Sequence, residues 1–188
     1  MSYFDYDVVI AVDVGLSGGI AFFDTVSGEL LSVYTMPTVS HESKTGKIKN
    51  SLDIDKLMFI LEIPKAHDES AILVMENIHA FPGQGVVAVG TLLEQKGILR
   101  GLACGLGYEV ELVEPRTWQK MFDLIPPEEL KGSTGTKTKT LRKKWLKENS
   151  LTKARELFPK CADTKLSKST AHGLSDALLI GKWFIDRS

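Results

Sequence analysis

The sequence predicts an α/β fold with a mixed five-stranded sheet flanked by helices. Three short apolar runs near the N-terminus are separated by tight turns, which favours consecutive antiparallel strands. Later apolar runs alternate with helical periodicity, which favours parallel strands joined by helical crossovers. The 188 residues, 43% hydrophobic and 25% charged, are typical of one compact domain, so we expect residues 1–188 to form a single unit.

The first three strands follow one another closely. Residues 8–13 are rich in Val and Ile and predict a buried strand. After a glycine turn at residues 15–19, residues 20–23 predict a second strand. The stretch TVSGE is typical of a hairpin turn, and LLSVYTM predicts a third strand that stops at Pro37.

The middle of the chain changes from polar to helical. Residues 40–51 are polar and predict a loop. A helix that ends at Pro64 is predicted from the spacing of Leu52, Ile54, Leu57, Met58, Leu61 and Ile63. Residues 71–75 predict a buried strand that leads into Glu76. Residues 86–106 predict a glycine-containing helix that packs closely on the sheet.

The last third begins with a fifth strand. It is predicted over residues 108–113, and it ends before Pro115. Residues 126–140 carry Pro, Gly, Ser and Thr and predict a mobile basic loop. Helical patterns follow, and we expect helices at residues 141–147, 152–158 and 172–185. This order of strands and helices is the RNase H-like arrangement.

Three acidic residues lie in apolar segments that are distant in the sequence. Asp13 ends VVIAVD, Glu76 ends AILVME, and Asp176 lies in AHGLSDALLIGKWF. An ionised carboxylate in such a segment is unfavourable unless it is paired or binds a cation. We therefore expect the three to converge on a divalent metal. Individually, each could instead be a turn cap, a surface residue or a helix-dipole partner.

Two local patterns add to this expectation. His172 and Asp176 are four residues apart and share one face of a helix. The glycines of DVGLSGG let the backbone turn tightly and approach a phosphate or a metal. The pattern DxGxxxG also opens actin-like and sugar-kinase ATPases, so by itself it leaves both classes open.

Basic residues gather in two stretches although the net charge is −1. The candidates for DNA contact are Lys44 and Lys47, with Lys137, Lys139, Arg142, Lys143, Lys147 and Lys153. Such blocks attract polyanions, although a solvated face has the same composition.

The ordered set AVDVGLSGGIAFF, ILVMENIHAFPGQG and AHGLSDALLI resembles the RuvC-like Holliday junction resolvases, in particular divergent phage and organellar members. The resemblance extends from about Val8 to Phe184. It implies a homodimeric endonuclease with an RNase H-like fold that resolves four-way DNA junctions in recombination and repair. It also implies two Mg²⁺ or Mn²⁺ ions in each active site and no other small-molecule cofactor.

The resemblance also implies roles for individual residues. Asp13, Glu76 and Asp176 match the family's metal-ligating carboxylates, and His172 matches the fourth ligand or water-activating group. The family often separates its last two ligands by three residues, whereas His172 and Asp176 are four apart. Phe81 falls where the family places an aromatic side chain against junction bases. Lys147 and Lys153 are candidates for the family's catalytic lysine.

The remaining expectations concern location and rival functions. We find no secretory signal and no apolar run long enough for a membrane span, and the two cysteines have no CxxC spacing. A cytoplasmic, nucleoid-associated protein is expected, in the host cytoplasm if a phage encodes it, with an organelle left open. The rivals are a nuclease for other branched DNA or RNA–DNA hybrids, a non-enzymatic junction binder, and an actin-like or sugar-kinase-type ATPase.

Overall fold

A five-stranded mixed sheet forms the centre of the computed structural model, which describes residues 6–43, 45–80, 85–130, 135–162, 165–167 and 171–187. The strand order is β3-β2-β1-β6-β7. The strands are β1 (Val8–Asp13), β2 (Gly19–Asp24), β3 (Leu30–Thr35), β6 (Ala71–Glu76) and β7 (Glu109–Val113). The first three pair antiparallel, whereas β6 and β7 run parallel to β1. The RNase H-like arrangement predicted from the sequence is confirmed.

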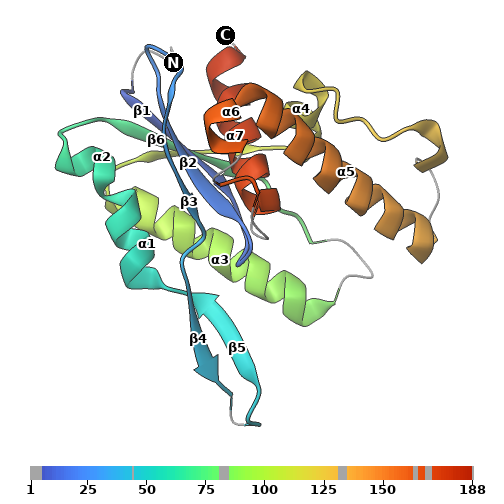
Figure 1. The fold of residues 1–188 in the computed structure, drawn as a ribbon. Coiled ribbons are helices and arrows are strands. Elements are labelled where there is room, and N and C mark those ends of the chain that lie inside the picture. Colours follow the sequence, from blue (N-terminus) through green and yellow to red (C-terminus); the bar gives the residue numbers. More distant parts are fainter. Residues whose placement is uncertain are drawn as a thin grey trace.

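Helices cover both faces of this sheet (Figure 1). On one face, α1 (Ile54–Leu61) and α3 (Val86–Gly105) pack on a core that includes Val8, Ile10 and Val12. On the other face, α7 (Ala171–Asp186) and α5 (Thr136–Leu157) pack on a core that includes Val9 and Ala11. Residues of β1 alternate between the two cores because successive strand side chains point to opposite faces. Within the described residues, no helix has the length and apolar character needed to cross a membrane.

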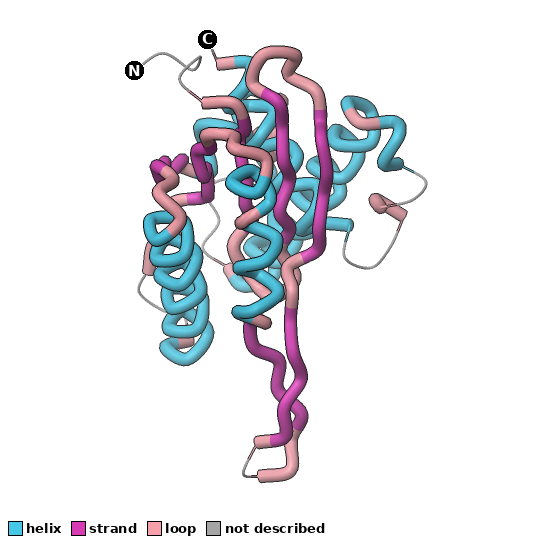
Figure 2. Tube along the Cα trace, turned by 90° about the vertical axis from the view of Figure 1, so that its left-hand side faces the viewer, coloured by secondary structure: helices cyan, strands magenta, loops and turns pink. Residues whose placement is uncertain are grey.

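Residues 40–51 do not form the loop that their polarity predicts. They lie largely in a two-stranded ribbon of β4 (Thr38–Glu42) and β5 (Ile48–Leu52), which pair antiparallel. The ribbon projects from the body of the protein as a narrow arm (Figure 2). All of β4 is exposed, and its edges carry no further strand from the described ranges. The prediction failed because a strand with water on both faces lacks the apolar alternation that identifies one.

Two prolines that follow predicted element ends also lie in the first turn of a further helix. Pro64 lies in the first turn of α2 (Ile63–Ala66), a short helix that directly follows α1. Pro115 opens α4 (Pro115–Met121), a helix that the sequence interpretation missed. Proline is well tolerated in the first turn because its missing N–H has no helical partner there.

The basic segment is more helical than expected. A turn of 3-10 helix covers Glu128–Leu130, and α5 then runs without interruption from Thr136 to Leu157. The loop predicted over residues 126–140 therefore extends past the start of α5. The helices predicted at residues 141–147 and 152–158 are parts of this one helix. A short helix, α6 (Pro159–Ala162), follows α5. Lys137, Lys139, Arg142, Lys143 and Lys147 consequently all lie on one element.

Candidate active site

Asp13 and Glu76 lie side by side at one edge of the sheet. Their strands are parallel neighbours, and Val12 pairs with Met75 in the position just before the two acids. Val9 and Ala11 of β1, like Ile72 and Val74 of β6, face the core beneath α7. The period of two residues places Asp13 and Glu76 on that same face. The apolar runs that form the strands thus also deliver both carboxylates to α7.

Backbone contact between two glycines positions α7. Gly18, in the turn between β1 and β2, makes an isolated bridge with Gly173. A Cβ atom on Gly173 would collide with the Ser17 carbonyl oxygen and with the Cα atom of Gly18. The first turn of α7 therefore lies directly against the turn that follows Asp13. Asp176 is one helical turn after Gly173, which places its carboxylate toward the strand ends.

The three carboxylates act on one another electrostatically. Burial, followed by the charges of Asp176 and Glu76, raises the pKa of Asp13 well above its usual range. Burial and the charge of Asp176 raise the pKa of Glu76 to about 7. Burial raises the pKa of Asp176 to about 6. These shifts mean that negative charge is unfavourable in this pocket unless a cation compensates it.

Three further side chains support the acids. The indole N–H of Trp118, a residue only 1% exposed on α4, donates to Glu76 Oε1 at 3.2 Å. Ser150 of α5 donates a side-chain hydrogen bond to Asp176, which lowers its pKa. Lys147, one helical turn earlier on α5, lowers the pKa of both Asp13 and Asp176 by its charge. Of the two candidate lysines, Lys147 is the one that acts on the carboxylates.

Sequence reasoning missed Trp118 and Ser150. Trp118 lies on α4, which was not predicted, and Ser150 lies in the gap between the two helices that α5 joins. A helix-start signal was present at Pro115, because proline is common in the first helical turn. No comparable signal was available for Ser150.

Two buried polar atoms on α7 have no hydrogen-bond partner among the described residues: Nδ1 of His172 and Oδ1 of Asp176. Buried polar atoms without partners are uncommon in folded proteins, and they mark places where an ion or water belongs. Ser175, by contrast, uses its hydroxyl within the helix, where it donates to the His172 carbonyl oxygen at 2.7 Å. His172 and Asp176 are therefore better suited to hold a ligand than Ser175.

A divalent cation fits the chemistry of this donor set. Carboxylate oxygens are the ligands that hard cations prefer, and a neutral imidazole nitrogen can join them. Among the described residues, however, no three His, Cys, Asp or Glu side chains are already arranged around a common metal position.

A polar network fixes the chain just after Glu76. Asn77 Nδ2 donates to Glu114 Oε1 at 2.7 Å, and His79 Nε2 lies 2.9 Å from the same oxygen. Lys96 Nζ donates to Asn77 Oδ1 at 2.7 Å, which ties the segment to α3. The network joins the ends of β6 and β7, and the charge of Glu114 contributes to the raised pKa of Glu76. It lies directly before Phe81, which is outside the described residues.

The remaining basic candidates divide by position. Lys47 is exposed on the β4–β5 ribbon, and Lys44 lies outside the described residues. Lys137, Lys139, Lys143 and Lys147 belong to α5, as does Arg142. Lys153 lies toward the other end of α5, where its ammonium pairs with Glu156 at 2.9 Å. The structure therefore gathers most of the candidates on α5, and on that helix Lys153 is engaged by Glu156.

Comparison with solved structures finds a similar fold in RuvC. The complex of Thermus thermophilus RuvC with Holliday junction substrate matches with a TM-score of 0.54 at 15% identity, covering 94% of this chain and 92% of that one. A Thermus thermophilus RuvC structure matches with a TM-score of 0.48 at 16% identity, covering 93% of this chain and 91% of that one. The fowlpox virus resolvase in complex with Holliday junction DNA gives 0.44 at 12%, covering 96% and 97%. No protein-family model and no curated protein matches the sequence.

Proposed function

We propose that this protein is a metal-dependent endonuclease that resolves four-way DNA junctions in recombination and repair. The observation that carries the proposal is the meeting of Asp13, Glu76 and Asp176 at one sheet edge, where all three pKa values are raised. The likeness of its fold to RuvC, solved in complex with a Holliday junction substrate, supports the choice of DNA. The substrates compared below distinguish junction resolution from cleavage of other branched DNA.

The acids and His172 are the residues that would hold the metal. Two Mg²⁺ or Mn²⁺ ions bound there would lower the pKa of a water and neutralise charge on the scissile phosphate. Trp118 holds the Glu76 carboxylate in position through its indole N–H. The ammonium charge of Lys147 acts on Asp13 and Asp176. At this place it would compensate the negative charge of a bound phosphodiester. The role of the protein groups is thus to place negative ligands and one positive charge around the phosphate.

The exposed basic elements would hold the arms of the junction. The N-terminal half of α5 extends away from the sheet and carries most of the basic candidates (Figure 1). On the β4–β5 ribbon, Lys49 lies on β5 opposite His41 of β4 and adds a second lysine to Lys47. Such contacts to phosphates position DNA without selecting sequence.

We also propose that two copies assemble with opposed active sites. Val86 and Val87 begin α3 and are 86% and 83% exposed. Along the same helix, Gly97, Gly101 and Gly105 recur at every fourth residue, and an added Cβ atom there would meet nothing within 4 Å. Glycine lowers helix stability by about 1 kcal/mol relative to alanine, so an open glycine stripe suits close packing by a second helix. Sedimentation velocity should show a dimer, and Gly101→Leu should weaken it.

The proposed activity is tested with three labelled substrates: a four-way junction, a linear duplex and a flap. Each is incubated with Mg²⁺ and, separately, with EDTA. We expect symmetric cleavage of the junction in Mg²⁺ alone and little cleavage of the duplex. Preferential cleavage of the flap would reassign the substrate, and cleavage of no substrate in Mg²⁺ or Mn²⁺ would refute the nuclease.

A further inference from the structure

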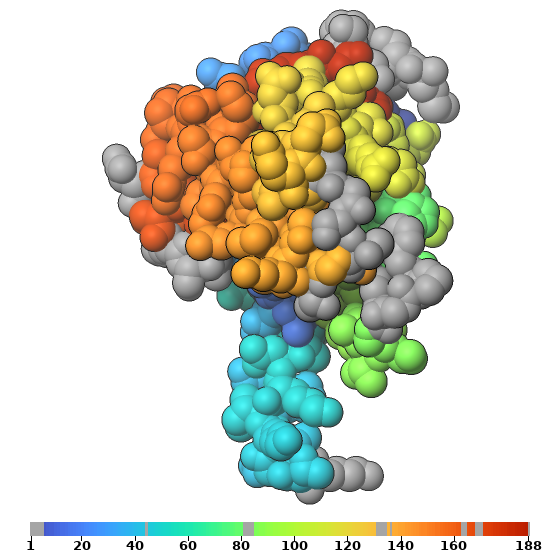
Figure 3. All heavy atoms as spheres, turned by 90° about the vertical axis from the view of Figure 1, so that its right-hand side faces the viewer, coloured from blue at the N-terminus to red at the C-terminus, as the bar shows by residue number. Residues whose placement is uncertain are grey.

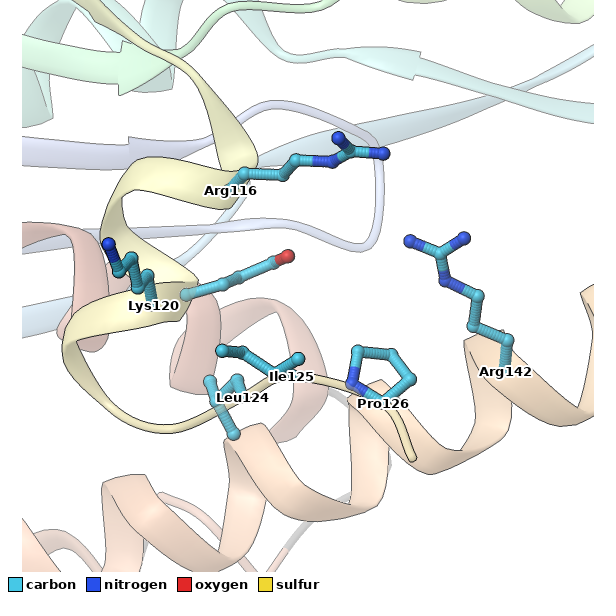
Figure 4. Close-up of a pocket in the computed structure, with 7 residues that line it drawn as sticks. Arg116, Lys120, Leu124, Ile125, Pro126 and Arg142 are labelled. Atoms are coloured by element: carbon cyan, nitrogen blue, oxygen red, sulfur yellow. The ribbon is translucent and has the colours of Figure 1, made fainter. Parts of the chain in front are cut away.

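A cavity of about 390 Å³ lies between α4 and α5, and none of the three carboxylates lines it. Its lining comes from α4, from the segment that follows α4, and from Arg142 of α5 (Figure 4). These three parts of the chain lie together on one face of the protein (Figure 3). The volume is within the range of about 300–1,000 Å³ that is typical of sites for small ligands.

Positive charge borders this cavity. Figure 4 shows the guanidinium groups of Arg116 and Arg142 directed into the same space from α4 and α5, while the Lys120 ammonium points away from them. No acidic residue is among the described residues that line the cavity. Within the described part of the chain, no hydrogen bond or ion pair occupies either guanidinium. Two guanidinium groups that face one opening suit a phosphate, which accepts paired hydrogen bonds from such groups.

Apart from the polar side chain of Gln119, the rest of the lining is apolar. Leu124 is only 3% exposed, whereas Ile125 beside it is 49% exposed, and Pro126 completes the surface. A free phosphate needs no apolar surface, and the stacked bases of a duplex present only their edges to a protein. A nucleotide that has left the stack presents both a flat apolar face and an adjoining phosphate. The arginines of the lining match the phosphate, and its apolar residues match the face of the base.

The position of the cavity links it to the carboxylates. On α4, Arg116 lines the cavity and Trp118 contacts Glu76. On α5, Arg142 lines the cavity, and Lys147 acts on Asp13 and Asp176. The helices α4 and α5 therefore each contribute residues both to the cavity and to the surroundings of the carboxylates. We infer that the cavity between α4 and α5 binds an unstacked nucleotide of the DNA strand that enters the active site, an inference that rests on the proposed function.

The test compares two short oligonucleotides of equal length in EDTA: a thymidine strand and an abasic strand with the same number of phosphates. Fluorescence anisotropy should show that the wild-type protein binds the thymidine strand about tenfold more tightly, because a base gains contact with the apolar surface. Ile125→Ser should remove this preference. Arg142→Gln should weaken binding of both strands clearly more than Lys143→Gln, a change of equal charge at an exposed neighbour that does not line the cavity.

Equal affinity of the wild-type protein for both strands would overturn the inference, as would equal effects of Arg142→Gln and Lys143→Gln. Thermal unfolding of each variant verifies that it is folded, and Ile125→Ala serves as a milder change at the same position. Because these assays measure binding without metal, they are independent of cleavage. If the wild-type protein cuts junctions but shows no thymidine preference, the inference about the cavity fails and the proposed nuclease stands. If it shows the preference but cuts no substrate, the proposed nuclease fails.

Discussion

The sheet edge that holds the carboxylates and the elements that carry the basic residues differ in how they are built. At the edge, Asp13 and Glu76 end strands whose other residues are buried, and backbone contact between Gly18 and Gly173 fixes α7. The β4–β5 ribbon and the N-terminal half of α5 are largely exposed to solvent. The comparison indicates that the fold fixes the positions of the carboxylates, whereas the basic elements are free to adjust to the proposed DNA substrate. Mutations near the carboxylates should then have large effects on cleavage. Mutations on the basic elements should have small, additive effects on junction affinity.

The largest effect is expected for Asp13→Asn, which removes one charge without changing shape. We expect cleavage of a four-way junction in Mg²⁺ to fall at least about 1,000-fold, because the missing ligand supports charge stabilisation of the reaction. Binding of the junction, measured by gel shift in Ca²⁺, should persist.

Asp24→Asn is the matched control, because Asp24 ends β2 and bonds within its own turn. It should retain cleavage. Full Mg²⁺-dependent activity of Asp13→Asn would show that the sheet edge is not the active site.

The second effect concerns α7. His172→Ala should lower the cleavage rate about 100-fold while changing junction affinity little, because His172 Nδ1 is a buried atom available to bind a ligand or a proton. Single-turnover rates at several Mg²⁺ concentrations measure this effect. His41→Ala, on the exposed ribbon, is the control and should leave the rate unchanged. An unaltered rate in His172→Ala would exclude His172 from the site.

The third effect is a pH dependence of stability without metal. The pKa of Glu76 is raised from 4.5 to about 7, so between these pH values the folded state retains a proton that the unfolded state releases. The free energy of unfolding therefore falls as the pH rises through that window, by about 3 kcal/mol at most. Urea unfolding in EDTA should show that Glu76→Gln gains stability relative to wild type as the pH rises.

Added Mg²⁺ should stabilise the wild-type protein at high pH more than Glu76→Gln, because the ion binds the ionised carboxylate. A stability difference between the two proteins that does not change with pH would mean that Glu76 ionises normally and does not face Asp176.

The smallest effect is expected on the ribbon. The double change Lys47→Gln, Lys49→Gln should weaken junction binding only a few-fold. It should also reduce the slope of log affinity against log salt by about 1 for each phosphate that a lysine no longer neutralises. Lys65→Gln, an exposed residue on α2, should leave the slope unchanged. If the double change lowered affinity as much as Asp13→Asn lowers activity, the distinction between the two regions would disappear.

The two regions also differ in how far the sequence predicts them. The apolar runs around Val9, Ala11 and Val74 identify buried strands, and the sheet register then brings Asp13 and Glu76 together. Exposed elements lack this signal, so polarity predicts a loop where the ribbon lies and places the start of α5 too late. Partners such as Trp118 and Ser150 escape prediction because their positions depend on how helices pack, which no local pattern encodes.

The bridge between Gly18 and Gly173 has a consequence for how this protein can evolve. Elsewhere, side-chain volume sets the spacing between a helix and a sheet, and each core substitution shifts it slightly. Here two main chains touch, so the distance is already at its lower limit. A Cβ atom on Gly173 would meet the Ser17 carbonyl oxygen, and one on Gly18 would meet the Asp13 carbonyl oxygen. Neither position can therefore acquire a side chain without displacing the turn beside the carboxylates, so evolution of the surrounding core has to retain both glycines.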